Sequence, residues 1–386
     1  MKAMPPTAIG TTGRTTLTRY LIERREATRQ DIERDLGMSL PTITRNLRSL
    51  EADGIVRNVA MRGSTGGRKA AAYGIDPNHR IAIGVAMRPN TVRVRAVNLN
   101  GEVIGSLDRT MSYRNQNTYY QRVGAIIGNL MDGIEQRYGR VLGVAFCVRG
   151  IVSPDGASIV FDDSGHVGPT LETIAQSVHR PCMLVGECDA LAAAELWTDP
   201  TLDDAVCIYL DRRPGGALTV GGRLHQGENR CNGAIAHMTL VPDGRPCLCG
   251  RRGCMDAYCS LETLPEDYES IPGFFSVLEQ GETNHRERMD AWLDHVAQAI
   301  ANARTVVAGD VVVGGEAALY LEDTDLEDLR RRIVARSPFG IERFVLRRSH
   351  GTEDQSLVGA ALRYVEPYLD DLCGGFRPRW TTAEPA

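Results

Sequence analysis

The sequence predicts an α/β protein with a small N-terminal winged helix-turn-helix and a larger body made of two similar halves. The chain has 386 residues, enough for two or three domains. Its first 75 residues combine short helical patterns with a glycine-rich hairpin, and the remainder alternates strands and helices in two successive units. The run Asp76-Pro77-Asn78 marks the boundary. We therefore expect a head over residues 1–76 and a body over residues 77–386.

The composition is that of an ordinary globular protein. Hydrophobic residues make up 42% and charged residues 24%, which excludes a fully disordered chain. No apolar run approaches the ~18 residues needed to span a bilayer, and the N-terminus lacks the apolar segment of a secretory signal. We therefore expect a cytoplasmic protein without membrane contact. In that reducing compartment, ten cysteines favour metal binding over disulfides.

The distribution of charged residues also separates the head from the body. Residues 1–75 carry 13 basic and 7 acidic side chains, whereas the rest carries 31 basic and 42 acidic ones. A basic head on an acidic body predicts that the head alone contacts a polyanion. The alternative is a chance fluctuation in a short window.

The head contains three predicted helices. Leu17, Tyr20 and Leu21 have helical spacing. The second helix begins after Thr28, in a capping-box-like pattern, and ends at Gly37.

The third helix begins at Ser39, tolerates a proline in its first turn and ends at Gly54. Its apolar residues recur every three or four positions, which predicts one buried face formed by Leu40, Ile43, Leu47 and Leu50.

The opposite face of that helix suits a DNA major groove. Short hydroxyls and guanidiniums read base edges and phosphates. A hairpin of residues 55–60 and 70–75 follows, with a basic tip that could track the DNA backbone or minor groove. The alternative is a helical dimerisation or protein-docking module. The predicted DNA-binding residues are Ser39, Thr42, Thr44, Arg45, Arg48, Gly67, Arg68 and Lys69.

The body repeats one pattern twice. Residues 81–87, 91–99 and 102–110 predict an antiparallel meander, which a helix (117–137) and a strand (141–148) follow. After a strand (182–187) and a helix (189–197), a hairpin (205–211 and 216–224), a long helix (286–308) and a strand (310–315) complete the second unit.

Four residues within eighteen positions predict a metal site. His237, Cys247, Cys249 and Cys254 offer one imidazole and three thiolates, with glycines for tight turns between the last two cysteines. These donors suit one tetrahedral structural zinc ion per chain. The alternative is a set of packed, unliganded cysteines. We expect the neighbouring Cys259 to be a core thiol.

Asp189 follows a strand and opens a helix. A carboxylate there can accept a proton or a hydrogen bond from a sugar hydroxyl. The alternative is a carboxylate that only stabilises the helix N-terminus.

Several segments resemble the ROK family of repressors, open reading frames and sugar kinases. The resemblance covers most of the chain and implies a bilobed, actin-like, ribonuclease H-like body. The segments are the zinc motif (233–258), the strand–Asp–helix segment VGECDALAAAE, the turn segment GVAFCVRGIVSPDG, the strand VVVGGEAAL and the closing helix VGAALRYV. The head is similar to that of the family's transcriptional regulators.

The departures from the family pattern concern phosphate and sugar contacts. Arg88-Pro89 and Arg212-Arg213-Pro214 replace the flexible glycines of the two phosphate loops, and proline offers no N–H to a phosphate. This implies that kinase activity is lost and that Asp189 is a vestigial catalytic residue.

The resemblance also implies an effector site at Arg149, Gly150, Cys188, Asp189, His237 and Asp256. Cys188 stands where the family has Asn, Asp256 where it has Glu, Ala234 where it has Glu, and Arg149 where it has Pro. Arg149 would favour a phosphate or carboxylate on the effector. The alternative is a structural salt bridge.

Together, these features imply a ROK-type transcriptional regulator, and we expect it to act as a repressor. It would bind double-stranded operator DNA as a homodimer or larger homo-oligomer and sense a sugar or sugar derivative. One alternative is an active ATP-dependent carbohydrate kinase with a DNA-binding head. The other is a regulator whose body has lost small-molecule binding and responds to a protein partner.

Overall fold

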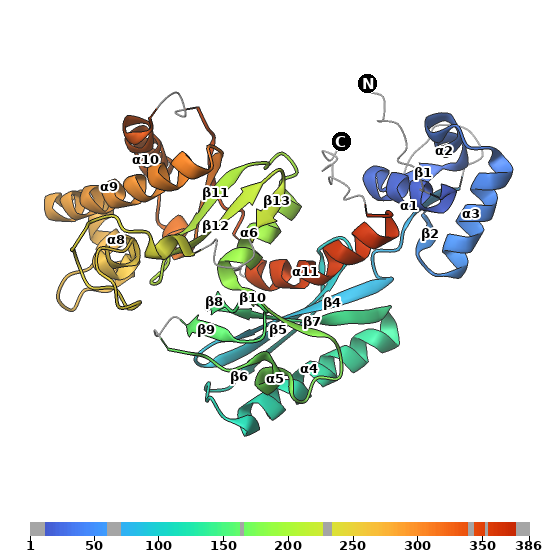
Figure 1. Cartoon of the computed structure of the whole chain (residues 1–386), viewed down its shortest axis with the longest axis horizontal. Helices are drawn as coiled ribbons and strands as arrows, with labels where there is room; N and C mark the ends of the chain where they lie inside the picture. Colours follow the sequence, from blue (N-terminus) through green and yellow to red (C-terminus); the bar gives the residue numbers. More distant parts are fainter. Residues whose placement is uncertain are drawn as a thin grey trace.

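The computed structural model describes residues 12–59, 71–162, 166–226, 234–338, 343–351 and 354–375. The head lies at one end of the molecule, and two lobes form the body, with helix α11 (Gln355–Leu372) running from the lobes toward the head (Figure 1). None of the helices in these ranges is long and apolar enough to cross a membrane.

The head is a three-helix unit with a small antiparallel sheet in the order β1-β3-β2. The β2–β3 hairpin was predicted, but β1 was not, because three residues carry no detectable alternation. The elements are α1 (Gly13–Arg24), β1 (Glu26–Thr28), α2 (Arg29–Leu36), α3 (Leu40–Ala52), β2 (Val56–Val59) and β3 (Ala72–Ile75).

Local sequence signals explain most of these boundaries. Thr28 and Asp31 form the predicted capping box, and Gly37 ends α2 in the left-handed conformation with φ +65°. The prediction for Ser39 was partly wrong: it holds the N-cap position, but its hydroxyl caps no backbone N–H of α3. It donates instead to the Thr42 hydroxyl.

The apolar face of α3 is confirmed at three of four positions. Ile43, Leu47 and Leu50 are at most 1% exposed and pack in the head core with Leu17. Leu40 is 44% exposed, so its predicted burial was wrong. The reason is that the first turn of α3 projects from the head, and helical periodicity cannot show where a helix leaves the core.

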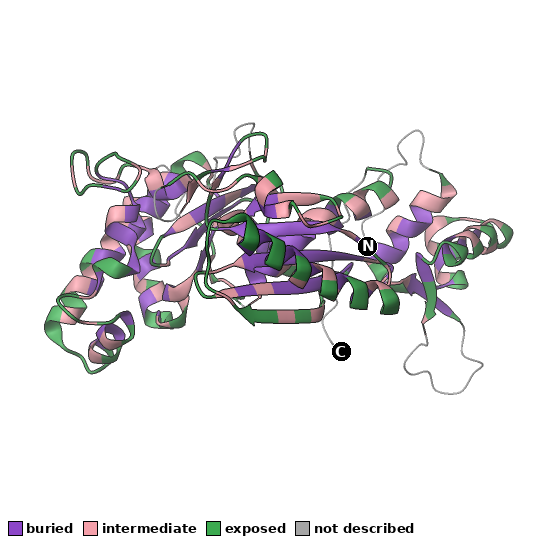
Figure 2. Cartoon of the chain, turned by 90° about the horizontal axis from the view of Figure 1, so that it is seen from below, coloured by how far each residue is buried: buried purple, intermediate pink, exposed green. Residues whose placement is uncertain are grey.

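The two lobes contain sheets of the same topology. Each five-stranded sheet has an antiparallel meander, a helix, and two further strands parallel to the first meander strand. The orders are β10-β7-β4-β5-β6 and β15-β14-β11-β12-β13. This confirms the predicted duplication, and Figure 2 shows the buried residues concentrated in these sheets.

The first lobe contains the predicted meander, which turns at Gly101 with φ +80°. Its elements are β4 (Arg80–Met87), β5 (Thr91–Asn98), β6 (Val103–Thr110), α4 (Asn117–Arg137), β7 (Arg140–Val148), β8 (Gly150–Val152), β9 (Ile159–Asp162), α5 (Leu171–Ala175) and β10 (Cys182–Gly186).

The second lobe carries more helices around its sheet. After α6 (Glu187–Thr198), the elements are β11 (Ala205–Tyr209), β12 (Gly215–Val220), β13 (Arg223–His225), η1 (Ala234–His237), α7 (Asp256–Cys259), η2 (Leu261–Thr263), α8 (Ile271–Glu279), α9 (Thr283–Val306), β14 (Asp310–Gly314), η3 (Glu316–Leu319), α10 (Asp323–Arg336) and β15 (Leu346–Arg348).

Helix α11 packs unusually close to its neighbours because two glycines leave room for it. A Cβ on Gly359 would lie 1.7 Å from the Ala190 carbonyl oxygen of α6. A Cβ on Gly84 of β4 would lie 2.1 Å from the Leu357 carbonyl oxygen. These backbone contacts fix α11 against both α6 and the first sheet.

Candidate functional site

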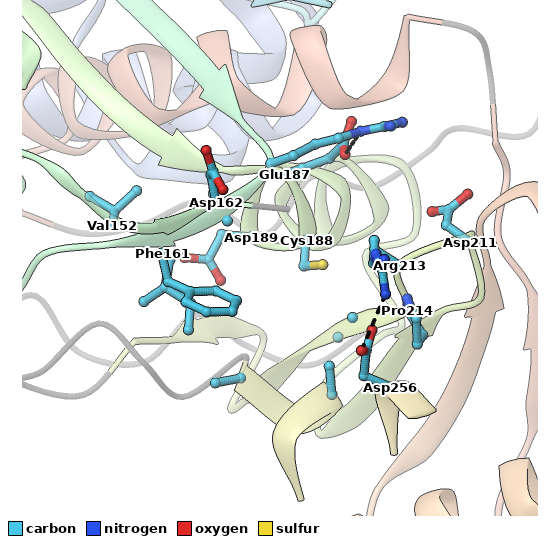
Figure 3. A pocket seen from close by; sticks show the side chains of 18 of the residues that line it. Val152, Phe161, Asp162, Glu187, Cys188, Asp189, Asp211, Arg213, Pro214 and Asp256 are labelled. Carbon is cyan, nitrogen blue, oxygen red and sulfur yellow. Dashed lines mark hydrogen bonds and ion pairs between the residues drawn. The ribbon is translucent and has the colours of Figure 1, made fainter. Parts of the chain in front are cut away.

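A cleft of about 730 Å³ opens between the two lobes (Figure 3). The ends of β10 and β11, the β8–β9 hairpin and the loop after η1 line it, with Arg363 of α11. Every residue of the predicted effector site lines this cleft: Arg149, Gly150, Cys188, Asp189, His237 and Asp256.

Asp189 lies in the first turn of α6, immediately after β10, as its sequence context predicted. Its Oδ2 accepts a hydrogen bond of 3.0 Å from Nε2 of Gln226, which follows β13, a strand against which α6 packs. This hydrogen bond links α6 to the end of β13, and both residues line the cleft.

Cys188 packs against the start of β12 rather than presenting a reactive thiolate. Burial raises the pKa of its thiol well above the ordinary value, and the neighbouring Glu187 carboxylate acts in the same direction. A Cβ on Gly215 would lie 2.4 Å from the Cys188 sulfur. The thiol therefore fills space beside Asp189.

Glu187 neutralises two arginines from the first lobe. Its carboxylate accepts from the Arg88 guanidinium and, at 2.8 Å, from Arg149 Nε. The Glu187 side chain is only 17% exposed. The salt bridge considered as an alternative for Arg149 is therefore present, and it weakens the case for an anionic effector.

The loop after β11 is likewise filled by the chain's own charges. Arg213 pairs with Asp256 at 3.5 Å across the second phosphate-loop position, beside Pro214. Burial raises the pKa of Asp211, although its Oδ1 accepts a 2.7 Å hydrogen bond from the Glu316 backbone N–H. Phosphate-binding loops present preorganised N–H donors, whereas this loop presents paired side chains.

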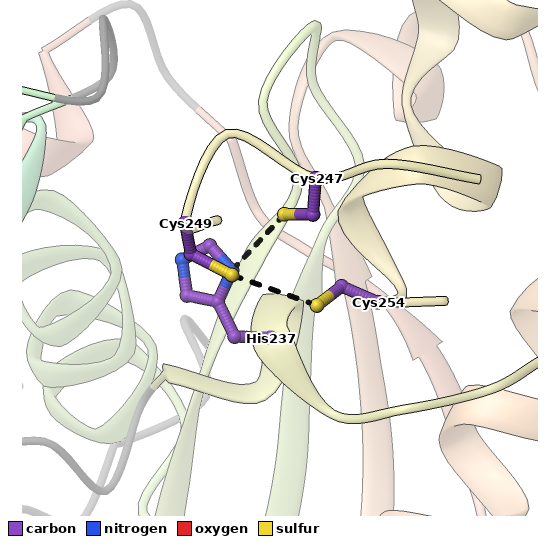
Figure 4. A group of neighbouring side chains, drawn as sticks. All are labelled: His237, Cys247, Cys249 and Cys254. Carbon is purple, nitrogen blue, oxygen red and sulfur yellow. Dashed lines mark hydrogen bonds between the residues drawn. The ribbon is translucent and has the colours of Figure 1, made fainter. Parts of the chain in front are cut away.

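The four predicted metal ligands converge in the loop between η1 and α7 (Figure 4). One donor atom from each of His237, Cys247, Cys249 and Cys254 lies within 4.8 Å of all the others. Burial lowers the pKa of His237, which favours the neutral imidazole that binds metals. The arrangement is able to hold a metal ion. Cys259 is fully buried in the lobe core, apart from this cluster.

The loop that carries the three cysteines has close backbone contacts that the sequence explains. Gly253 has φ +78°, and a Cβ there would lie 1.8 Å from the Val241 carbonyl oxygen. His237 also makes an edge-to-face contact with Phe161 of β9, with ring centroids 5.4 Å apart. The loop thus forms one wall of the cleft and contacts the opposite lobe.

The predicted DNA-binding face of α3 is accessible. Arg45 and Arg48 are exposed, and Thr42 and Thr44 are half-buried at its flanks. In the part of the chain that the structure describes, neither arginine forms a hydrogen bond or ion pair. Gly67, Arg68 and Lys69 of the hairpin tip lie outside the described residues.

Sequence reasoning missed cleft residues that come from other elements. Phe161 and Asp162 reach the cleft from β9, which is too short to predict. Gln226 and Arg363 arrive from a strand end and from α11, and no local signal marks either one. Glu187, two residues before Asp189, is a further cleft residue that the sequence did not single out.

The fold and the site define a winged helix-turn-helix joined to a bilobed actin-like body. The sequence model of the ROK family matches residues 82–365. The chain therefore belongs to the ROK family.

Known relatives include both regulators and kinases. The DNA-binding transcriptional dual regulator NagC of Escherichia coli is 23% identical over 275 residues, which cover 70% of this chain and 66% of that protein, just under two thirds of its length. An N-acetylmannosamine kinase of Vibrio cholerae is 26% identical over 237 residues, covering 58% of this chain and 80% of that one.

One matching solved structure covers the head as well as the body. A crystal structure of a ROK family transcriptional regulator, described as a homologue of the E. coli MLC protein, superimposes with a TM-score of 0.76 at 17% identity. The match covers 93% of this chain and 98% of the other. The chain thus has the architecture of a ROK regulator.

Proposed function

We propose that this protein is a ROK transcriptional regulator that binds operator DNA through α3 and senses a sugar in the interlobe cleft. The accessible face of α3 is the observation that carries the proposal. Two cations there, Arg45 and Arg48, have no ion pair among the described residues that would compete with DNA. A homodimer or larger homo-oligomer would present two such heads to a two-fold operator, and repression is the proposed action.

Salt and substitution test the DNA contact. Binding of the full-length protein to duplex DNA, measured by fluorescence anisotropy, should weaken steeply with salt because phosphate contacts release counterions. Arg45→Ala and Arg48→Ala should each weaken binding by about 1–3 kcal/mol. Arg34→Ala is the matched control, since Arg34 lies on α2 and pairs with Asp31 and Asp35. Equal affinities for all variants would refute the docking.

The charges of the cleft favour an effector without a phosphate. The arginines that line it pair with carboxylates: Arg149 with Glu187, Arg213 with Asp256, and Arg363 with Glu366 at 3.4 Å. The remaining one, Arg212, lies 3.6 Å from Glu316. Seven carboxylates in total line the cleft against these four guanidiniums. An anionic ligand would have to break these pairs, whereas a neutral sugar needs only the carboxylates and Gln226 as hydrogen-bond partners.

A thermal-shift screen tests this proposal. Neutral sugars should include a compound that raises the melting temperature of the wild type, and Asp189→Ala should abolish its effect without loss of DNA binding. The same sugars as 6-phosphates should have a smaller effect. A response to phosphorylated sugars alone would overturn the neutral-effector proposal. A response to no sugar would favour a protein partner.

Loss of kinase activity is the second part of the proposal. Phosphoryl transfer needs donors preorganised around the phosphates, and here Pro89, Pro214 and two side-chain ion pairs occupy those loops. An active kinase is the second candidate function, because the chain retains Asp189 and has a kinase among its relatives. Incubation with ATP and the sugar screen should give no ADP beyond background, and sugar-dependent ADP release would support the kinase.

Zinc is the metal that we propose for the four-ligand cluster. Three soft sulfurs and one imidazole nitrogen, converging in a closed loop, fit a structural zinc ion and leave no position for a substrate. Bound zinc would cross-link the loop and thereby stabilise it. His237, Leu248 and Asp256 belong to this region and line the cleft, so the metal would also fix the shape of the effector site.

A further inference from the structure

Asp189 is the first member of a chain of hydrogen-bonded side chains that line the cleft. Gln226 donates from Nε2 to Asp189 Oδ2 at 3.0 Å and accepts at Oε1 from the Arg363 guanidinium at 3.1 Å. Arg363 also pairs with Glu366 one turn further along α11. Three elements, namely α6, the end of β13, and α11, thus meet through the two ends of one amide side chain.

The turn of α11 that follows Arg363 lacks one backbone hydrogen bond. Pro367 lies inside α11 and has no N–H. The carbonyl of Arg363, four residues earlier, therefore lacks its intrahelical hydrogen bond. Proline is a common cause of bending in helices. The side chain that contacts Gln226 thus belongs to the residue at which the proline interrupts the hydrogen bonding of α11.

The other end of α11 forms the joint with the head. Leu369 and Cys373 are buried in one cluster with Ile22 of α1, and Leu372 packs against the head core. Nine residues of helix separate Arg363 from Leu372, a distance of about 14 Å. One helix therefore connects the cleft contact directly with the DNA-binding head (Figure 1).

We propose that Gln226 and Arg363 are positioning residues that orient Asp189 and couple the cleft to the head. A ligand hydroxyl that takes the place of the Gln226 amide on Asp189 releases Gln226 from one side. The Gln226–Arg363 contact then changes, and so does the direction of the half of α11 beyond Pro367. This inference rests on the proposed function for its biological meaning, but the mechanical coupling is testable without DNA or effector.

Hydrogen exchange of the full-length protein tests the coupling. Gln226→Ala and Arg363→Met should each speed amide exchange in α1 and in residues 369–375 by at least threefold, although neither side chain touches the head core. Gln280→Ala is the matched control, because it also removes a glutamine hydrogen bond, to Ser276 at the end of α8. It should leave α1 unchanged.

Two outcomes would overturn the inference. One is faster exchange confined to residues 223–226 and the start of α6, as expected of a purely local role. The other is a Pro367→Ala variant, which restores the missing N–H, in which Gln226→Ala still speeds exchange in α1 to the same extent. Should Arg363→Met fail to fold, Gln226→Ala and Pro367→Ala decide the question. Failure here leaves the DNA contact standing, since that contact is tested by Arg45→Ala.

Discussion

Replacing Glu187 by glutamine tests whether the chain's own ion pairs fill the first phosphate position. The change keeps the shape but leaves Arg88 and Arg149 without their shared carboxylate. Removing one partner of a fully buried pair costs about 3–5 kcal/mol, whereas an exposed pair contributes about 0–1 kcal/mol. The Arg88 side chain is 21% exposed and that of Arg149 is 49% exposed, so we expect an intermediate loss of about 1–3 kcal/mol.

Thermal unfolding with and without inorganic phosphate is the assay. Each kcal/mol should lower the melting temperature by about 2–4 °C in a domain of this size. Millimolar phosphate should stabilise Glu187→Gln, in which two guanidiniums have lost the Glu187 carboxylate, more than the wild type. Glu172→Gln is the control, because Glu172 is exposed on the first lobe. An unchanged melting temperature together with equal phosphate effects would refute the reasoning.

Three further predictions concern the metal, the head and α9. Metal analysis should find about one zinc per chain, and Cys249→Ser should lower both zinc content and melting temperature; a metal-free wild type with the same stability would contradict this. Leu47→Ala should destabilise the head by about 2–5 kcal/mol in chemical denaturation, because Leu47 is 1% exposed; a loss below that range would mean a looser core. Hydrogen bonds to Glu282 and Glu269 raise the pKa of His285. Its contribution to stability should therefore be complete below its unfolded pKa of about 6.5 and disappear as the pH rises through the higher folded value, so His285→Ala should cost more at pH 5.5 than at pH 9; equal costs would be the contrary result.

The sequence was most informative where one short segment contains the whole signal. The His/Cys cluster that could hold a metal lies within eighteen residues, and glycines fix its turns, so residue type and spacing predicted it. The capping box at Thr28 and the apolar spacing of Ile43, Leu47 and Leu50 are equally local. The repeated pattern of meander, helix and strand predicted the two sheets, because each strand and helix in it has its own local hydrophobic pattern.

The sequence was least informative where residues meet only in the folded chain. Gln226 and Arg363 are 137 positions apart and form one hydrogen bond. Arg88 and Glu187 are 99 positions apart, so the neutralisation of the cleft arginines was not visible, and Arg149 alone suggested an anionic effector. Leu40 is a further example. Helical periodicity predicted the face of α3 on which Leu40 lies, but not that this part of the face is exposed.

Selection of binding sites from a random duplex library tests the central claim most directly. If the protein is an operator-binding regulator, the full-length wild type should enrich a two-fold repeat with half-sites about one helical turn, or a multiple of it, apart. Arg45→Ala should enrich the same repeat with relaxed preference at one base pair of each half-site. Recovery of random sequences, at any salt concentration that still permits binding, would contradict the account.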